Sequence, residues 1–361
     1  MSGTDGLAAL HLAPGTPLLV RSPNWVGDAV MALPFYDALR HAFPGCPVTV
    51  VARPHAADIA RLDPAVEVLV HDDRGLGAAT LGRLAAARRL RERCFGAAFL
   101  LPNSLSSALL PFLARIPVRV GYSKDARGLL LTHRLPWDAR ARSLHRVQVY
   151  LDLLSRLGLP VPADSTSRRV TSDAERFEAE AVLARAGVAP DTRLAAIAPG
   201  AVGVSRRWPA ERFGDTARAL AAALGARVLV LGGPADRPLA AAAAARAGAC
   251  AIDLAGAAPL ALLPALLDRC DVLVSNDSGA AHVASLTATP TLVLFGAGNE
   301  AITRPMGPNI HILRTTLDCT PCEKNSCARG DLACLTALDA GAVSALAIRI
   351  ARQVAAATSN T

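Results

Sequence analysis

A turn near the N-terminus, Ser22-Pro23-Asn24-Trp25-Val26-Gly27-Asp28, carries the first side chain that could do chemistry. It separates an apolar run from an amphipathic run, which we expect to be a strand and a helix. Asp28 begins that helix, so its carboxylate could cap backbone N–H groups of the first turn. At the edge of a binding site the same carboxylate could instead act as a general base. Position alone leaves both interpretations open.

Paired cations stand in a second loop, which runs from Pro199 to Pro209. Gly200 lets backbone N–H groups, including that of Ala201, approach a ligand closely. The neighbouring guanidiniums of Arg206 and Arg207 can grip phosphate oxygens in fork geometry. We therefore expect a diphosphate here. The alternative is two solvated arginines ahead of a helix.

A third segment, residues 275–282, follows an apolar run and opens a helix. Its polar side chains are Asn276, Asp277, Ser278 and His282. Each of the first three could simply cap the helix, and the histidine could belong to the core. Together with Gly279 they form a polar group at a helix N-terminus, where ribose hydroxyls and phosphate oxygens find partners.

A glycine turn from Leu231 to Asp236 follows another apolar run, and Gly232 and Asp236 could border an adenine or a ribose. No G-x-G-x-x-G follows the first expected strand and no Walker A sequence occurs. Dinucleotide oxidoreductases and P-loop phosphotransferases are therefore disfavoured. An Asp-x-Asp metal motif is also absent from the sequence.

Short apolar runs alternate with helical runs along the chain, which predicts an α/β protein with doubly wound parallel sheets. The expected strands are 18–21, 48–52, 97–101, 118–122, 194–198, 227–231, 251–254, 272–275 and 291–295. The expected helices are 28–42, 81–93, 104–114, 145–157, 210–224, 237–246, 260–269 and 279–286. In such sheets ligands bind beyond the carboxyl ends of the strands, where the loops above lie.

The length of 361 residues predicts two domains. We expect an N-terminal domain over 1–160, a linker over 161–172 and a C-terminal domain over 173–342. The linker lies in a stretch, 159–172, that is rich in Pro, Ser and Asp. A helix and tail over 343–361 complete the chain. A long uncharged stretch, 94–114, is interrupted by Gly, Pro and Ser, so we expect no transmembrane segment. The N-terminus lacks a basic region before its apolar stretch, which favours a cytoplasmic protein.

The net positive charge lies almost entirely in the first half. Residues 1–160 hold 19 Lys and Arg against 12 Asp and Glu, or +7, whereas residues 161–361 hold 19 against 18, or +1. This asymmetry predicts an anionic partner for the first half. Aromatic residues are only 4% and do not alternate with basic runs, so a nucleic-acid platform is disfavoured.

The candidate loops occur in an order and spacing that resemble the bacterial ADP-heptose:lipopolysaccharide heptosyltransferases of glycosyltransferase family 9. The resemblance extends from Leu18 to Thr336. Its motifs are Asn24-Trp25-Val26-Gly27-Asp28, Leu101-Pro102-Asn103-Ser104, Arg119-Val120-Gly121-Tyr122, Pro199-Gly200-Ala201, Arg207-Trp208-Pro209, Leu254-Ala255-Gly256 and Asn276-Asp277-Ser278-Gly279. The first two forms resemble heptosyltransferase II, which adds the second inner-core heptose, more than heptosyltransferase I.

The resemblance implies a GT-B fold, with two Rossmann-like domains facing each other across a cleft, and inverting transfer without a bound metal. It implies that Asp28 is the catalytic base. With the loop analysis it gives these residues to bind the donor, ADP-heptose: Gly200, Ala201, Arg206, Arg207, Gly232, Asp236, Asn276, Asp277, Ser278, Gly279 and His282. Arg206 departs from the family, which usually has Lys there; Arg can neutralise the departing diphosphate but is bulkier and cannot donate a proton.

The implied acceptor is the lipopolysaccharide inner core, an anionic and membrane-bound molecule that the +7 half would attract. The candidate acceptor-binding residues are Asn24, Trp25, Asn103, Ser104 and Arg127, and the unranked further cations are Arg53, Lys124, Arg142 and Arg146. A buried turn is an equally good interpretation of Asn103 and Ser104. Peripheral attachment to the inner face of the inner membrane would fit this charge.

Four cysteines, Cys319, Cys322, Cys327 and Cys334, follow a C-x2-C-x4-C-x6-C spacing. They could hold a structural zinc ion, remain reduced thiols or form a local disulfide. Two other functions stay open. One is another family 9 transferase, such as heptosyltransferase I, and the other is a non-catalytic protein that binds a nucleotide sugar or a metal.

Overall fold

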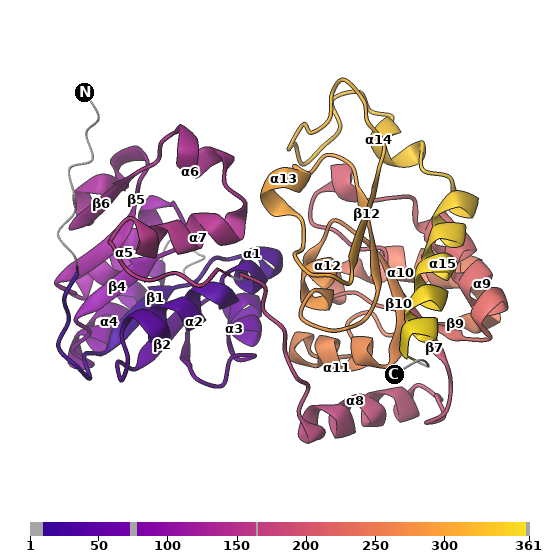
Figure 1. Cartoon of the computed structure of the whole chain (residues 1–361), viewed down its shortest axis with the longest axis horizontal. Coiled ribbons are helices and arrows are strands. Elements are labelled where there is room, and N and C mark those ends of the chain that lie inside the picture. The colour runs from indigo at the N-terminus through magenta and orange to yellow at the C-terminus, as the bar shows by residue number, and fades with distance from the viewer. Residues whose placement is uncertain (1–9, 73–77, 164, 359–361) are drawn as a thin grey trace. The chain divides into compact units, whose positions relative to one another are not determined.

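The computed structural model describes residues 10–72, 78–163 and 165–358. The chain divides into two compact units, Met1–Thr166 and Ser167–Thr361. Figure 1 shows the first from indigo to magenta and the second from magenta to yellow. Each unit is a six-stranded parallel sheet with covering helices, which confirms the predicted α/β fold class.

The sheet of the first unit has the order β3-β2-β1-β4-β5-β6. Its strands are β1 (Leu18–Arg21), β2 (Val48–Ala52), β3 (Glu67–Val70), β4 (Ala97–Leu100), β5 (Val118–Ser123) and β6 (His133–Pro136). β1, β2 and β4 are buried along their whole length, as continuous apolar strands covered on both faces should be. The half-exposed edge strands β3 and β6 were not predicted from the sequence.

The helices of this unit are α1 (Val26–Met31), α2 (Leu33–Ala42), α3 (Pro54–Ala60), α4 (Ala78–Glu92), α5 (Leu105–Leu113), α6 (Ala139–Ser143) and α7 (Arg146–Ser155), with a 3-10 turn η1 (Asp125–Leu130). The predicted single helix over 28–42 is wrong, because the chain breaks at Ala32. Pro34 has no N–H to continue the first helix, and it stands instead in the first turn of the second.

The sheet of the second unit has the order β12-β11-β10-β7-β8-β9, which repeats the topology of the first. Its strands are β7 (Leu194–Ala198), β8 (Arg227–Val230), β9 (Ala251–Asp253), β10 (Cys270–Asn276), β11 (Thr291–Phe295) and β12 (Ile310–Arg314). The predicted bounds of β7 and β11 are confirmed, and both strands are fully buried. The half-exposed edge strand β12 was missed.

The helices of the second unit are α8 (Asp173–Arg185), α9 (Ala210–Leu224), α10 (Arg237–Ala247), α11 (Leu263–Asp268), α12 (Gly279–Ala284), α13 (Glu300–Thr303), α14 (Ala333–Thr336) and α15 (Ala340–Thr358). Four 3-10 turns join them: η2 (Val204–Arg206), η3 (Pro234–Asp236), η4 (Gly248–Cys250) and η5 (Leu260–Leu262). Apolar residues of α9, α10 and α15 share one core with β7, β8 and β10. Within the described part of the chain, no helix combines the length and hydropathy needed to cross a bilayer.

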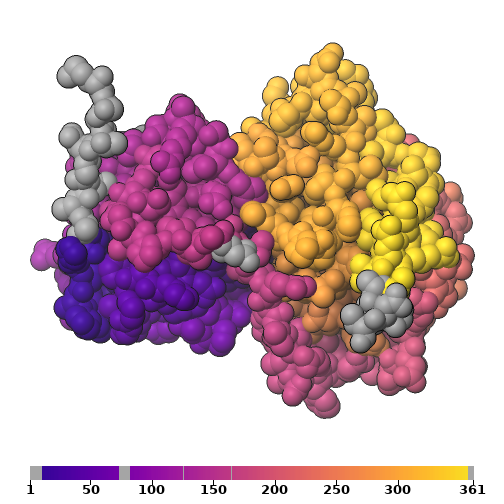
Figure 2. Space-filling view, in the orientation of Figure 1, coloured from indigo at the N-terminus to yellow at the C-terminus, as the bar shows by residue number. Residues whose placement is uncertain are grey.

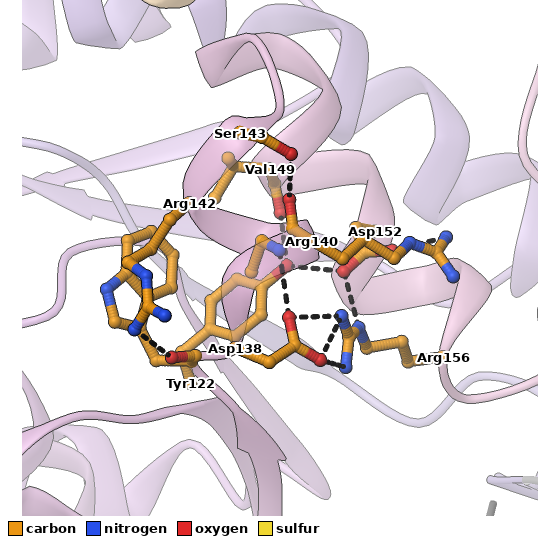
Figure 3. A network of polar contacts seen from close by, with 10 residues as sticks. Tyr122, Asp138, Arg140, Arg142, Ser143, Val149, Asp152 and Arg156 are labelled. Atoms are coloured by element: carbon orange, nitrogen blue, oxygen red, sulfur yellow. Dashed lines mark hydrogen bonds and ion pairs between the residues drawn. The ribbon is translucent and has the colours of Figure 1, made fainter. Parts of the chain in front are cut away.

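A buried polar network holds α7 in the first unit (Figure 3). The Asp152 carboxylate is 4% exposed and accepts hydrogen bonds from the Tyr122 hydroxyl at 2.7 Å and from Arg140 at 2.9 Å. Arg156 donates to Asp152 at 2.5 Å and also pairs with Asp138 at 3.0 Å. The pKa of Asp138 is lowered, chiefly by the hydrogen bonds from Arg156, whereas burial raises the pKa of Tyr122. These contacts join α7 to β5 and to the start of α6.

Replacing Asp152 with Ala should lower the free energy of unfolding by about 3 kcal/mol, because Tyr122 and Arg156 would lose a buried acceptor. Urea unfolding measures this difference. The matched control is Asp58→Ala, which removes an ion pair to Arg61. In that pair the Arg61 side chain is 50% exposed and the Asp58 side chain is 36% exposed. That change should cost less than about 1 kcal/mol. Equal effects of the two substitutions would contradict the structural role of Asp152.

Candidate active site

Each sheet has one switch point, which is the pair of neighbouring strands whose chain connections leave in opposite directions. In the first unit this point lies between β1 and β4, where Arg21 pairs with Leu100 in register. The loops that follow the two strands therefore start side by side. Ligands of open parallel sheets bind in the crevice at such a point. The sequence-predicted loops at residues 22–28 and 101–104 are the two loops that meet there.

Asp28 lies in the first turn of α1, at this edge of the sheet. Its side chain is 29% exposed, and its Oδ1 lies 3.9 Å from Nε of Arg146, the first residue of α7. The carboxylate is therefore partly accessible and stands beside a cation. Arg146 was only one of several unranked cations in the sequence. The charge excess of the first half was the signal for it, but the pairing depends on how α7 packs against α1.

Trp25 precedes α1 and is 61% exposed, which is unusual for so large an apolar side chain. Its neighbour Asn24 is half-buried, and the amide oxygen accepts a hydrogen bond from Arg21 at 3.4 Å. Arg21 also donates to the Val51 carbonyl at 3.0 Å. Asn24 thus helps to hold the loop, whereas Trp25 presents an aromatic face to whatever binds at this edge.

The β4 loop offers a second polar group at the same edge. Ser104 is exposed and its hydroxyl lies 3.1 Å from that of Ser106. The Asn103 amide oxygen is buried and finds no hydrogen-bond partner among the described residues. A buried oxygen without a partner is costly unless a ligand or water donates to it.

Arg127 does not lie at the surface, contrary to the prediction that it contacts the acceptor. Its side chain is fully buried, and the guanidinium donates to the carbonyl of Pro102 and to the hydroxyl of Ser107. Burial lowers the pKa of Arg127 to about 10. A Cβ at Gly121 would overlap this guanidinium, so a larger residue there would have to displace it. Arg127 therefore supports the loop that follows β4 from the interior of the unit.

The corresponding point of the second unit lies between β7 and β10, where Ala198 pairs with Ser275. Asn276 ends β10 and is fully buried. Its amide donates to the Pro199 carbonyl at 2.8 Å and accepts from the backbone N–H of Trp208 at 3.0 Å. These two bonds hold both ends of the 199–208 loop. Asn276 was predicted to contact the donor; the structure gives it this supporting role instead.

Arg206 and Asp277 form the charged centre of this edge. Nη1 of Arg206 lies 3.2 Å from Oδ2 of Asp277, and their side chains are 31% and 2% exposed. Burial raises the pKa of Asp277 to about 6, although the nearby Arg206 partly opposes this shift. Nε of Arg206 and Oδ2 of Asp277 form no hydrogen bond with any described residue, because the ion pair lacks hydrogen-bond geometry. The partly exposed Arg206 guanidinium keeps further N–H groups that a ligand could use.

Arg207 is partly used by its own loop, because Nε donates to the Ala201 carbonyl at 2.8 Å. The Asp236 carboxylate accepts from the Gly233 N–H at 2.9 Å and lies so close to Gly200 that a Cβ there would overlap it. The predicted glycine turn and the arginine loop are thus in contact. Gly232, which follows β8, lies against the same Asp236 side chain.

The remaining predicted donor residues lie at the start of α12. Ser278 and Gly279 are half-buried, and the Ser278 hydroxyl lies 3.2 Å from that of Ser275. His282 is 5% exposed and belongs to the buried side of the helix. The part of this segment nearest the sheet edge is therefore Asp277 to Gly279.

All eight cysteines lie in the described residues, and each is a reduced thiol. Cys334 is buried, and its pKa is raised mainly by burial and further by the charges of Cys327, Cys322 and Cys319. Across residues 10–72, 78–163 and 165–358, however, no three His, Cys, Asp or Glu side chains converge as a metal site.

Two Rossmann-like units, one with a partly exposed carboxylate and one with cations at its switch point, have the architecture of the GT-B class and fit a nucleotide-sugar transferase. Comparison with known proteins agrees. The model of glycosyltransferase family 9 (heptosyltransferase) matches residues 83–333, and the chain belongs to this family.

The chain is 28% identical to lipopolysaccharide heptosyltransferase 2 of Salmonella typhimurium over 326 residues. The matched region covers 87% of this chain and 92% of that relative. The chain is 29% identical, over 316 residues, to lipooligosaccharide heptosyltransferase 2 of Haemophilus influenzae, covering 82% and 88%. The solved structure of Escherichia coli ADP-heptose lps heptosyltransferase II is similar at a TM-score of 0.79 with 25% identity, covering 94% and 99%.

The raised pKa of Asp277 predicts a pH-dependent cost to stability. Between pH 4 and 6 the native carboxyl keeps its proton while the unfolded one ionises, so wild-type stability falls as the pH rises through this range. Asp277→Asn should therefore become more stable than the wild type by about 2–3 kcal/mol above pH 6, with no such gain at pH 4 or below. Urea unfolding across this range tests it. A difference that does not vary with pH would contradict the assignment.

Proposed function

We propose that this protein is an inverting heptosyltransferase of the second-heptose type. It transfers L-glycero-D-manno-heptose from ADP-heptose to the first heptose of the lipopolysaccharide inner core. The observation that carries the proposal is the 28–29% identity to heptosyltransferases 2 over 82–87% of the chain. The residues at the two switch points supply the groups that such a transfer needs.

Asp28 takes the proton of the acceptor hydroxyl as its oxygen attacks the anomeric carbon of the donor. A carbon–oxygen bond forms there, while the bond from the same carbon to the β-phosphate oxygen breaks. ADP leaves with that electron pair, and attack from the opposite face inverts the configuration. The Arg146 guanidinium lies 3.9 Å from this carboxylate, at the place where the proton would be taken up.

The ADP portion binds at the switch point of the second unit. Arg206 and Arg207 face the diphosphate, and backbone N–H groups of Gly200, Ala201 and Gly279 add donors. Asp277 and Ser278 remain for hydroxyl groups of the ribose or the sugar. In the proposed step these arginines and N–H groups stabilise the departing ADP electrostatically, and no metal takes part.

The acceptor binds at the switch point of the first unit, where Trp25, Asn103 and Ser104 present an aromatic face and polar groups. The +7 charge of residues 1–160 attracts the phosphates and acidic sugars of the acceptor. We place the protein in the cytoplasm, peripherally at the inner face of the inner membrane, where this acceptor would be available. A zinc ion at Cys319, Cys322, Cys327 and Cys334 remains a prediction for metal analysis.

Asp28→Asn should lower kcat by at least about 100-fold, because the amide cannot accept the proton. The Kd for ADP should stay within about twofold, since the donor residues belong to the other unit. Transfer kinetics and calorimetry measure the two values. Asp37→Asn, which changes a carboxylate that is 57% exposed on α2, is the control and should keep wild-type turnover. Wild-type turnover of Asp28→Asn would refute the role of the base.

A donor-by-acceptor assay tests the function itself. ADP-heptose should be consumed with an acceptor that carries one inner-core heptose and not with one that carries none. Transfer to the heptose-free acceptor would instead indicate heptosyltransferase I. Binding of ADP-heptose without transfer to either acceptor would indicate a non-catalytic protein. Transfer should persist after dialysis against EDTA, because the proposed step uses no metal.

A further inference from the structure

The segment that holds the four clustered cysteines, residues 319–334, is attached to the candidate donor site of the second unit. Ser205, one residue before Arg206, is 1% exposed. Its N–H donates to the Asn325 carbonyl at 3.1 Å and its hydroxyl donates to the Lys324 carbonyl. The Glu323 N–H donates to the Ala297 carbonyl at 2.8 Å, just beyond β11. The backbone of 323–325 is thus attached to two strand-end loops.

This attachment brings a further cation to the edge. Figure 1 shows the chain between β12 and α14 as a long loop, and Figure 2 shows the same orange-to-yellow segment on the surface. Lys324 is exposed, and no carboxylate lies within ion-pair distance of it among the described residues. It is one of only two lysines in a chain that otherwise uses Arg. Its backbone is hydrogen-bonded to the residue next to Arg206.

The arginines at this sheet edge are already engaged with other groups of the protein, so a further cation could contribute to phosphate binding. Arg206 is paired with the buried Asp277, so these two side chains together contribute little net charge. One N–H group of Arg207, at Nε, already donates to the Ala201 carbonyl. A departing diphosphate develops further negative charge and needs a cation that can follow it. An ammonium on a flexible stem can reorient its three donors, whereas a paired and planar guanidinium cannot.

We infer that Lys324 is a further donor-binding residue, whose ammonium contacts the diphosphate of ADP-heptose and stabilises ADP as it leaves. This inference rests on the proposed function, because it takes the donor to be ADP-heptose. The hydrogen bonds that join residues 323–325 to Ser205 and Ala297 then serve to hold the backbone of this lysine at the sheet edge. The side chain is exposed, so replacing it leaves the core intact.

The test compares Lys324→Met and Lys324→Arg with the wild type. Lys324→Met should raise the Kd for ADP about tenfold and lower kcat at saturating ADP-heptose, while the Kd for adenosine stays unchanged. Lys324→Arg should recover most of the ADP affinity, since it restores the charge. Arg329→Met is the matched control, because it removes a cation from the same segment whose charge Asp331 already offsets at 3.0 Å. It should leave the Kd for ADP unchanged.

Calorimetry with ADP and adenosine separates the outcomes. If the wild type binds ADP and Lys324→Met binds it within twofold of the wild type, the inference fails and the proposed function stands. If the wild type binds neither ADP nor ADP-heptose, both fail. Equal loss of ADP and adenosine affinity in Lys324→Met would indicate a disturbed loop rather than a lost phosphate contact, and would also overturn the inference.

Discussion

One buried amide supports the candidate donor site. Asn276 bonds to Pro199 at the start of the arginine loop and to Trp208 at its end, so a single side chain from β10 sets the span of the loop. Trp208 adds a second restraint, since its indole N–H donates to the Leu338 carbonyl at 3.1 Å. The loop can therefore present Arg206 and backbone N–H groups without a ligand to order it. Preorganised donors of this kind cost no reorganisation when charge develops on a leaving group.

Arg206 lies on that supported loop and pairs with Asp277, which follows β10. Burial disfavours the ionised Asp277, and Arg206 only partly compensates. An anionic ligand would compete with Asp277 for the guanidinium, so binding of a diphosphate and the state of this carboxyl are coupled. Lysine, the usual family residue at position 206, would offer a point charge in place of a fork. Lys324 brings an ammonium to the same edge from a different part of the chain.

The first unit differs from the second in that its candidate residue is a partly exposed carboxylate. Asp28 is partly exposed beside Arg146, and the position of Arg146 depends on α7. The Asp152 network fixes α7 to β5 and α6 with bonds that are largely shielded from water. The two charged clusters are therefore linked through one helix. Residues 1–160 carry a surplus of cations, which would attract an anionic partner.

The sequence by itself determined the two-sheet plan, because fully buried strands such as β1, β7 and β11 are continuous apolar runs with loops rich in Gly and polar residues behind them. Motif order then identified the loops that meet at each switch point. The edge strands β3, β6 and β12 escaped prediction, since half-exposed strands lack that apolar signal. Only the tertiary structure separated supporting residues from exposed ones. Asn276 and Arg127 are polar residues in promising loops, yet contacts with residues far along the chain bury them. The same long-range packing brought Arg146 to Asp28 and Lys324 to the arginine loop, and no local pattern encodes such distances.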